Sequence, residues 1–396
     1  MSNLTSWAYL SRVIEGPSTH LQELLRAGRD ADEIARGIRH RASWLGPLLA
    51  STERRYDWDR PEEDLEQAHS LGYALLTPDA PGWPGARIEE SFVRGAFASR
   101  ENMDNPIADA AAPHALWVRG AHNVRELCEQ SVAFVGTRAA TAYGHQATQD
   151  LVTSIATHRY TVISGGAIGI DTVAHEAALA ARTPTVVVAA CGPGVTYPRR
   201  NERLFERIVA AGGSVVSEYP PGVTPDRHRF LTRNRLVAGL SLGSVVVEAA
   251  FRSGALNTLK WARYFNRQAM AVPGSILGAG SLGANLAIRN GSATMVLNGD
   301  QIHAQLGAFG TAEGEEQLEL AYAADPIQQL SHNELRVYDA TPPHDTQGHE
   351  AEDIAASAGM STGLTVHLLM ELERRGMVLR NRRQWSRTQT SHVGSE

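Results

Sequence analysis

The chain has 396 residues and a formal net charge of −6 at pH 7, and 43% of its residues are hydrophobic. A chain of this size can bury its own cores without help from a metal or a disulfide. Cys128 and Cys191 lie in unrelated contexts, which argues against a disulfide framework or a zinc site and fits a reducing compartment. No signal-peptide pattern opens the sequence, and no window approaches the run of about 18 apolar residues of a membrane helix. We therefore expect a cytoplasmic protein with no membrane partner.

The basic side chains are almost all arginine: Lys260 is the only lysine, and the other 36 of the 37 basic residues are arginines. The negative net charge alone argues against a nucleic-acid partner, but the cations are clustered, and their distribution matters more than the total. A bias in genome composition accounts for the preference for arginine. Its consequence is that any phosphate must be bound mainly by guanidinium groups, which bind bidentately and can also stack on bases.

The first part of the chain has helical patterns rather than strands, followed by turn-rich sequence and a polar segment at 89–105. Residues 113–120 then suggest a short strand that leads into the next domain. We expect residues 1–112 to form a small helical N-terminal domain, of the SAM or helix-hairpin-helix type, with no catalytic residues. The predicted helices cover residues 19–28, 32–49 and 61–71.

Strands alternate with helices in the central part, residues 113–308. The strand candidates are nearly continuous apolar runs, as expected for strands that are buried on both faces of a parallel sheet. This pattern predicts a doubly wound α/β domain, an extended Rossmann-like fold with a mostly parallel sheet, in which ligands bind outside the carboxyl ends of the strands. The runs cover residues 132–135, 161–163, 185–190, 214–216, 244–247, 269–272 and 294–297.

The last part of the chain follows an acidic stretch, residues 309–327, that we interpret as a linker. Residues 328–390 show three helical patterns and then a short hairpin, which is the outline of a winged-helix-like domain. Such a domain could bind duplex DNA or mediate protein contacts, and the sequence leaves both open. Its end carries six arginines and no acidic residue: Arg374, Arg375, Arg380, Arg382, Arg383 and Arg387.

The segment from Ser164 to Asp171 is rich in glycine and joins a strand to a helix. Free backbone N–H groups and the positive end of the helix dipole make such a junction an anion site. A tight turn that needs glycine for a positive φ is the alternative. Asp171 is expected to brace this turn, and His175 to be a buried residue of the helix that follows.

Other strand ends carry glycines, small hydroxyl groups and arginines as well, so they should meet along one rim that holds several phosphates. There is no Walker lysine loop, no pair of metal-ligand spacings, no nucleophile elbow and no strict dinucleotide fingerprint. The rim therefore suggests binding rather than catalysis, and we expect no enzyme activity and no cofactor. The predicted DNA- and phosphate-binding residues are Gly136, Thr137, Arg138, Ser164, Gly165, Gly166, Ala167, Arg199, Asn201, Arg233, Asn234, Arg235, Ser253, Gly254, Thr258 and Asn285.

This set of motifs resembles the DNA-processing protein A (DprA/Smf) family over about 165 residues in family order. The quoted motifs include Gly136-Thr-Arg138, Tyr197-Pro-x-x-Asn201 and Arg233-Asn-Arg235. The resemblance implies a cytoplasmic homodimer that binds and protects incoming single-stranded DNA during natural transformation, in competent cells, and loads the RecA recombinase on it. It also implies that Arg138 contacts the strand and that the backbone of residues 164–167 receives phosphate. Ile168 departs from the family, which usually has a basic residue there.

Several alternatives remain open at this point. Arg233 and Arg235 either contact DNA or hold Glu218 or Glu248 in a structural pair. Ser253 and Thr258 either contact a nucleotide or only cap a helix. A nucleotide sensor or phosphoribohydrolase-like enzyme that uses Glu248 is the first functional alternative. A ligand-sensing transcription factor is the second.

Overall fold

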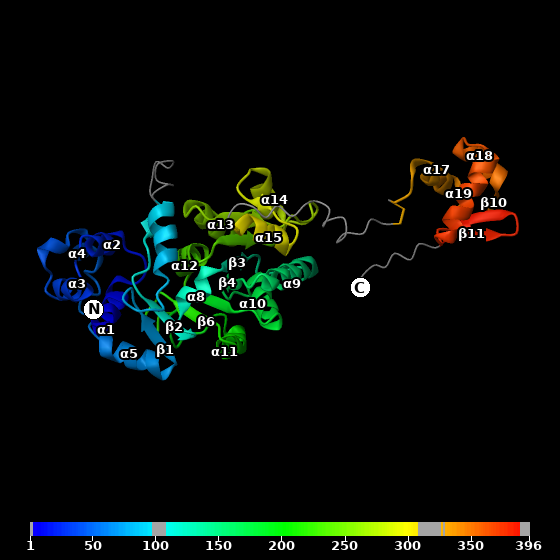
Figure 1. The fold of residues 1–396 in the computed structure, drawn as a ribbon. Helices are drawn as coiled ribbons and strands as arrows, with labels where there is room; N and C mark the ends of the chain where they lie inside the picture. Colours follow the sequence, from blue (N-terminus) through cyan, green and yellow to red (C-terminus); the bar gives the residue numbers. More distant parts are fainter. Residues whose placement is uncertain (1–2, 97–107, 308–325, 328, 389–396) are drawn as a thin grey trace. The chain divides into compact units, whose positions relative to one another are not determined.

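The larger part of the structure is built on a nine-stranded sheet with the strand order β1-β2-β6-β5-β4-β3-β7-β8-β9 (Figure 1). The strands from β6 through β9 in this order are parallel. At one edge, β2 pairs antiparallel with β6, and β1 pairs antiparallel with β2. The fold is therefore a mixed α/β architecture with a mostly parallel sheet, as predicted. The strands are β1 (Tyr73–Leu76), β2 (Leu116–Gly120), β3 (Ser131–Val135), β4 (Thr161–Ser164), β5 (Thr185–Ala189), β6 (Ser214–Ser217), β7 (Gly243–Val246), β8 (Gln268–Ala271) and β9 (Thr294–Met295).

The computed structural model describes residues 3–96, 108–307, 326–327 and 329–388. The chain divides into two compact units, Met1–Thr311 and Ala312–Glu396. The predicted linker, residues 309–327, lies almost wholly outside the described residues. Within the described ranges, no helix is long and apolar enough to cross a membrane.

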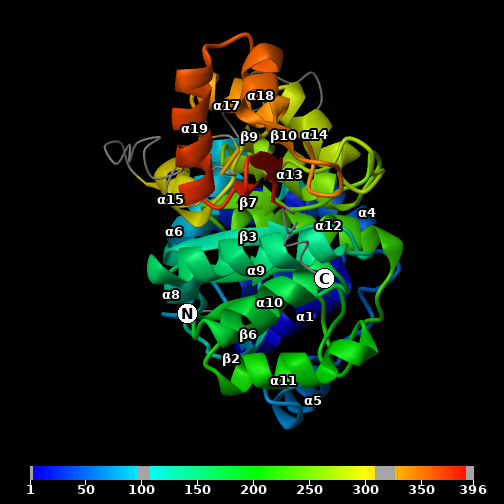
Figure 2. The same cartoon turned by 90° about the vertical axis from the view of Figure 1, so that its right-hand side faces the viewer.

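Helices cover both faces of the central strands, because the side chains of each strand alternate between two cores. On β3, Val132 and Phe134 pack with α9, α10 and α15, whereas Ala133 and Val135 pack with α12 and α13. Figure 2 shows α9 and α10 in front of the sheet. The helices of the first face are α9 (Ala142–Thr157), α10 (Ile170–Ala180), α11 (Glu202–Ala210) and α15 (Gly299–Leu306); those of the second are α8 (Val124–Glu129), α12 (Arg227–Gly239), α13 (Ala255–Tyr264) and α14 (Leu282–Arg289). A short 3-10 helix, η4 (Arg199–Asn201), precedes α11.

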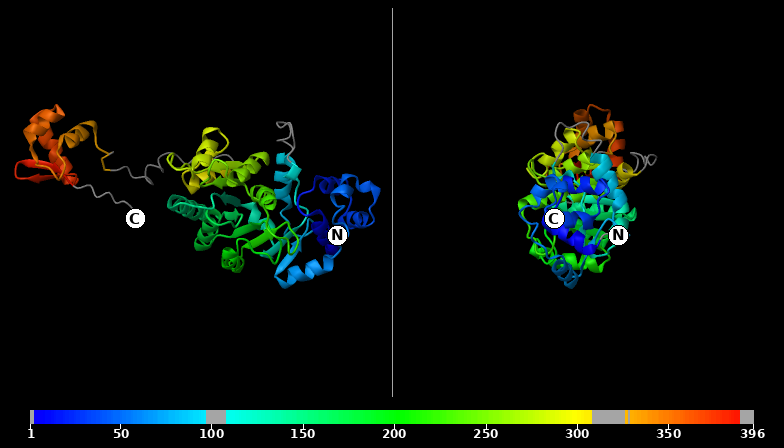
Figure 3. Two further views of the ribbon diagram at one scale, coloured as in Figure 1. Left: turned by 180° about the vertical axis from the view of Figure 1, so that it is seen from behind. Right: turned by 90° about the vertical axis from the view of Figure 1, so that its left-hand side faces the viewer.

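The N-terminal helices lie beside β1 and β2 (Figure 3). They share a core with Leu75 and Trp117. The Trp117 indole donates a hydrogen bond of 3.0 Å to the Ser11 hydroxyl on the first helix. The N-terminal region is thus attached to the edge of the sheet and belongs to the same compact unit as the sheet. Its helices are α1 (Leu4–Ile14), α2 (Thr19–Arg26), α3 (Ala31–Arg39), η1 (Ser43–Leu45), α4 (Pro47–Ser51) and α5 (Pro61–Ser70).

The structure corrects two predictions for this region. The single helix expected over residues 32–49 is broken, because Arg41 and Gly46 adopt positive φ values of 55° and 57° that no α-helix accommodates. The expectation of helices alone was also wrong, because β1 pairs with β2, and α1 was not predicted. The polar segment at 89–105, for which no secondary structure was predicted, begins with the π-helical η2 (Glu89–Gly95), which follows α6 (Gly85–Ile88). Residues 97–105 lie outside the described ranges. A short 3-10 helix, η3 (Ala108–Ala110), leads toward β2.

The second unit contains α17 (His332–Ala340), α18 (Ala351–Ala358) and α19 (Thr362–Arg374). A three-stranded antiparallel sheet joins them, with the strand order β10 (His349–Glu350), β12 (Gln384–Arg387) and β11 (Val378–Asn381). Helix α17 begins with a capping box between Ser331 and Glu334. The core of the unit includes Val337, Ile354 and Trp385.

Candidate nucleic-acid interface

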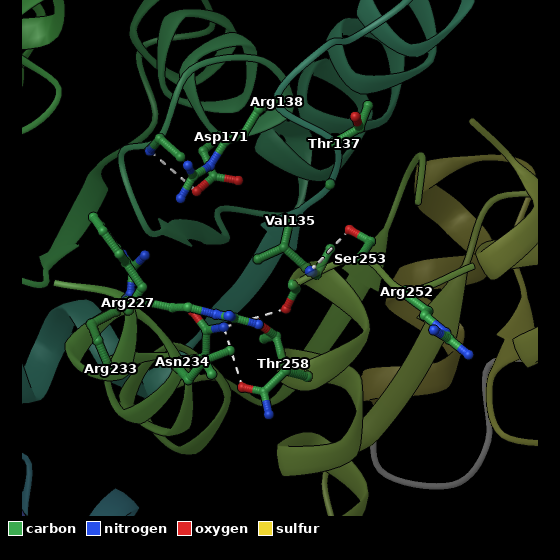
Figure 4. Close-up of a pocket in the computed structure, with 17 residues that line it drawn as sticks. Val135, Thr137, Arg138, Asp171, Arg227, Arg233, Asn234, Arg252, Ser253 and Thr258 are labelled. Atoms are coloured by element: carbon green, nitrogen blue, oxygen red, sulfur yellow. Dashed lines mark hydrogen bonds between the residues drawn. The ribbon is translucent and has the colours of Figure 1, made fainter. Parts of the chain in front are cut away.

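The strand order reverses at β3, which has β4 on one side and β7 on the other. Connections leave such a switch point in opposite directions, so a crevice opens outside the carboxyl ends of the strands. A cavity of about 610 Å³ lies there, and the N-terminal ends of α10, α12 and α13 surround it (Figure 4). It is lined by Val135, Gly136, Thr137, Arg138, Ala167, Asp171, Arg227, Phe230, Leu231, Arg233, Asn234, Arg252, Ser253, Gly254, Ala255, Asn257 and Thr258.

Three positively charged side chains that line this cavity are exposed: Arg138 after β3, Arg227 at the start of α12 and Arg252 before α13. Arg233 adds a buried positive charge, and Asp171 is the only acidic residue of the lining. The N-termini of α10, α12 and α13, which surround the cavity, add partial positive charge to it. The cavity is therefore suited to bind anions.

An aromatic pair extends this surface beyond the cavity. The Arg138 guanidinium lies over the Phe230 ring at 5.3 Å, and the Phe230 ring lies 5.2 Å from that of Tyr197, measured between centroids. Tyr197 is 41% exposed. Guanidinium and aromatic planes both stack on nucleobases, so cationic and stacking groups are adjacent here.

Sequence reasoning missed Arg227, Phe230, Leu231 and Arg252 as lining residues. A usable signal was present for two of them, because Arg227 and Phe230 are separated by one helical turn in the connection that follows β6. Their three-residue spacing places them on one face of α12 as soon as the start of that helix is known.

The glycine-rich turn after β4 is held mainly from within the protein. Gly166 and Gly169 adopt φ values of 70° and 85°, and a side chain at Gly166 would collide with Phe205 and Val187. Ser164 is buried and donates its hydroxyl to the Phe134 carbonyl at 2.6 Å. The Ala167 N–H donates to Asp171 at 3.3 Å, so Asp171 braces the turn. In the described structure, only Ala167 and Asp171 of this segment line the cavity, and Ile168 does not.

Arg233 supports the turn from below. Its guanidinium donates to the Gly165 carbonyl at 2.6 Å and also to the Val188 carbonyl. Burial lowers the pKa of Arg233, but a guanidinium stays protonated at any physiological pH. Burial raises the pKa of Asp171, and the charge of Arg233 opposes that rise. Arg233 thus combines a structural role with a place in the cavity wall.

Arg235 is a correction to the predicted phosphate contacts. Its side chain is fully buried, and one of its terminal nitrogens donates to both carboxylate oxygens of Glu218 at 2.6 and 2.7 Å. Burial raises the pKa of Glu218, and the Arg235 charge opposes the rise. Arg235 and Glu218 therefore form the structural pair that the sequence left as an alternative.

Comparison with known proteins places this site in a family. Residues 101–307 match the family model of DNA recombination-mediator protein A. A DNA processing protein DprA of Mycobacterium tuberculosis is 39% identical over 94% of this chain and 91% of its own length. The chain belongs to the DNA recombination-mediator protein A family.

Two further comparisons are with the DprA of Streptococcus pneumoniae, one by sequence and one by structure. The DprA of Streptococcus pneumoniae strain R6 is 38% identical over 49% of this chain and 67% of that protein. A crystal structure of DprA from Streptococcus pneumoniae superposes with a TM-score of 0.62 at 28% identity, and it covers 78% of this chain and all of its own. The family resemblance drawn from the motifs is thereby confirmed.

The remaining predicted residues of this family member fall into two groups. Gly136, Thr137, Asn234, Ser253, Gly254 and Thr258 line the cavity. The others lie outside its lining: Asn201 is buried and donates to the Gly166 carbonyl at 3.0 Å, and Asn285 pairs with both backbone groups of Gly274. Arg199 is exposed outside the lining. Asn201 and Asn285 therefore support loops in this structure.

Glu248, the carboxylate of the hydrolase alternative, does not line the cavity. It is 2% exposed and accepts hydrogen bonds from the Thr141 N–H and hydroxyl at 3.0 and 2.7 Å, next to the start of α9. This arrangement gives it a structural role at a helix N-terminus. Among the described residues of this family member, no group of three or more His, Cys, Asp or Glu side chains could hold a metal ion.

Proposed function

We propose that this protein binds single-stranded DNA in the cavity outside the carboxyl ends of β3, β4 and β7 and acts as a recombination mediator. The observation that carries the proposal is the arrangement of Arg138, Phe230 and Tyr197 beside a cavity with three further arginines. Guanidinium groups would neutralise successive phosphates, and the aromatic rings would stack on bases. Stacking requires bases that are splayed out of a duplex, which favours a single strand.

A polymer suits the site better than a mononucleotide. The cationic side chains approach the cavity from three separate segments, after β3, at the start of α12 and before α13, and exposed Arg199 and Arg200 follow Tyr197 outside it. A row of phosphates can use all of these charges, whereas one phosphate uses only the nearest. Binding should therefore be tolerant of sequence and strongly dependent on salt.

Replacing Arg138 by alanine tests the proposal most directly. We expect at least about tenfold weaker binding of an oligothymidylate, because the variant loses a phosphate contact and a stacking plane. The slope of log affinity against log salt should become shallower by about one unit. The matched control is Arg207→Ala, because Arg207 is exposed on α11 and does not line the cavity.

Titrations by fluorescence anisotropy at several salt concentrations provide both quantities. Equal affinities for wild type and Arg138→Ala would exclude this cavity as the DNA site. Tighter binding of duplex than of single strands by the wild type would favour the transcription-factor alternative.

We further propose that the protein acts as a homodimer that protects incoming single strands during natural transformation and loads a RecA recombinase on them. Membership of the recombination-mediator family supports this role. The test is whether the full chain enables RecA to form joint molecules on a strand already coated with single-strand-binding protein, with sedimentation measuring the oligomeric state. No stimulation by a preparation that binds DNA would contradict the mediator role but not the DNA site.

We propose that the second unit is a winged-helix-like domain and that its basic edge contacts either duplex DNA or a partner protein. Three helices precede a hairpin whose turn carries exposed Arg382 and Arg383. The described residues from Arg374 onward contain six arginines and no acidic residue. Replacing Arg380, Arg382 and Arg383 by alanine together should reduce duplex binding if the partner is DNA and leave it unchanged if the partner is a protein.

A further inference from the structure

The N-terminal helices contact the cavity-forming helix α12 through a network of charged groups. Glu15, at the end of α1, accepts two hydrogen bonds from Arg229 of α12, at 3.0 and 2.6 Å, on one carboxylate oxygen. Its other oxygen accepts a hydrogen bond of 2.7 Å from Arg55. Charge-assisted hydrogen bonds of this kind are the strong ones, and the three side chains are 14 to 27% exposed. One carboxylate therefore links two arginines that lie far apart in the sequence.

The segment before α12 is held from the same side. Arg12 of α1 forms a bidentate pair with Asp64 and also donates to the Pro221 carbonyl at 2.8 Å. Arg229 donates in turn to the Thr224 carbonyl at 2.7 Å. The loop that leads into α12 is thus fixed at two points, by side chains from α1 and from α12 itself.

Glu15 is the residue that closes α1. Its φ is 50°, in the left-handed region in which helices commonly end, and its N–H donates to the Ser11 carbonyl. A cavity of about 440 Å³ is lined by Arg12, Glu15 and Arg229 and by residues 221–224. Polar contacts rather than close packing therefore set the distance between α1 and α12 at this point.

We propose that Glu15 is a positioning residue for the DNA site: it fixes the first turn of α12 and so the placement of Arg227 and Phe230. The inference rests on the proposed function, because Arg229 lies between these two residues and does not itself line the cavity. Without Glu15, the Arg229 side chain loses its charged partner and, of its hydrogen bonds, keeps only the one to the Thr224 carbonyl, so the first turn gains freedom that binding must then restrict. The N-terminal helices thereby become part of the DNA-binding apparatus.

The experiment replaces Glu15 by glutamine, with Glu62→Gln as the matched control because Glu62 is an exposed N-terminal glutamate. We expect Glu15→Gln to bind an oligothymidylate about fivefold more weakly, with faster amide exchange in residues 228–231 and unchanged exchange in β3 and β4. The double variant Glu15→Gln with Arg229→Gln should lose little more affinity than whichever single variant binds more weakly, because each substitution breaks the same contact.

Wild-type affinity and wild-type exchange in Glu15→Gln would overturn the inference. Faster exchange spread evenly over the whole unit would overturn it as well, because it would show general destabilisation. If the wild type itself fails to bind single strands, the proposed function is wrong, and the local exchange of α12 still decides whether Glu15 positions this helix.

Discussion

The first turn and the middle of α12 (Arg227–Gly239) use the same residue type for opposite purposes. At its first turn, exposed Arg227 lines the cavity and faces solvent. Farther along, Arg233 and Arg235 are 5% and 0% exposed and are bonded to backbone carbonyls and to Glu218. A guanidinium at the rim keeps its hydration and stays available to a phosphate. A guanidinium in the core must have partners within the protein, because an unpaired buried charge is strongly destabilising.

The comparison teaches that a basic motif does not by itself define a contact with a ligand. Arg233 and Arg235 belong to one motif, yet only Arg233 reaches the cavity wall. In a helix, two positions separated by two residues point about 200° apart, so they rarely share one environment. The position of each arginine relative to the sheet decides its role.

Removing the buried partner should have the largest effect. Arg235→Ala leaves Glu218 as a buried carboxylate without its counter-charge, and we expect a loss of about 3–5 kcal/mol in the free energy of unfolding. Urea denaturation followed by circular dichroism measures it. The double variant Arg235→Met with Glu218→Leu should recover most of the loss, because it removes both charges. A loss below about 1 kcal/mol for the single variant would contradict the assigned role.

Two histidines buried near the arginines in the middle of α12 should also make the stability of the protein sensitive to acid. Burial, together with the nearby charges of Arg233 and Arg235, lowers the pKa of His175 to about 3 and that of His114 to about 4. Both values lie below that of an unfolded histidine, so the unfolded state binds more protons and stability falls as the pH drops below about 6.5. Each histidine should lower the free energy of unfolding by about 2 kcal/mol between pH 7 and pH 5.

Urea denaturation at these two pH values tests this expectation. His175→Gln should show a smaller difference between the two pH values than the wild type, whatever its stability at pH 7. The control is His158→Gln, because His158 is partly exposed and pairs with Asp300 at the surface. The same difference for His175→Gln and wild type would contradict the assignment.

A substitution in the first turn of α12 should have the smallest effect, and this effect should be confined to DNA binding. Arg227→Ala should leave the free energy of unfolding within about 0.5 kcal/mol of wild type, because the side chain is exposed. Binding of single strands should weaken by about 1 kcal/mol, with a salt slope shallower by about one unit. Destabilisation comparable to that of Arg235→Ala would contradict the distinction between the first turn and the middle of the helix.

The sequence alone determined the sheet and its cavity edge to a large extent. Continuous apolar runs such as residues 132–135 and 214–216 mark strands that are buried on both faces, and β3 and β6 lie there. Because the carboxyl ends of parallel strands meet at one edge, Arg138 and Ser253 could be placed near each other although they lie far apart in the chain. The family followed from the same motifs.

Only the tertiary structure decided which polar residues face the cavity and which support it. Asn201, Asn285 and Arg235 share residue types and motifs with ligand-binding groups, but their partners are backbone carbonyls and Glu218. The antiparallel addition of β1 and the contact between Glu15 and Arg229 depend on segments up to 214 residues apart. Periodicity and local motifs describe neighbours along the chain, whereas the pairing of buried charges depends on how distant segments pack.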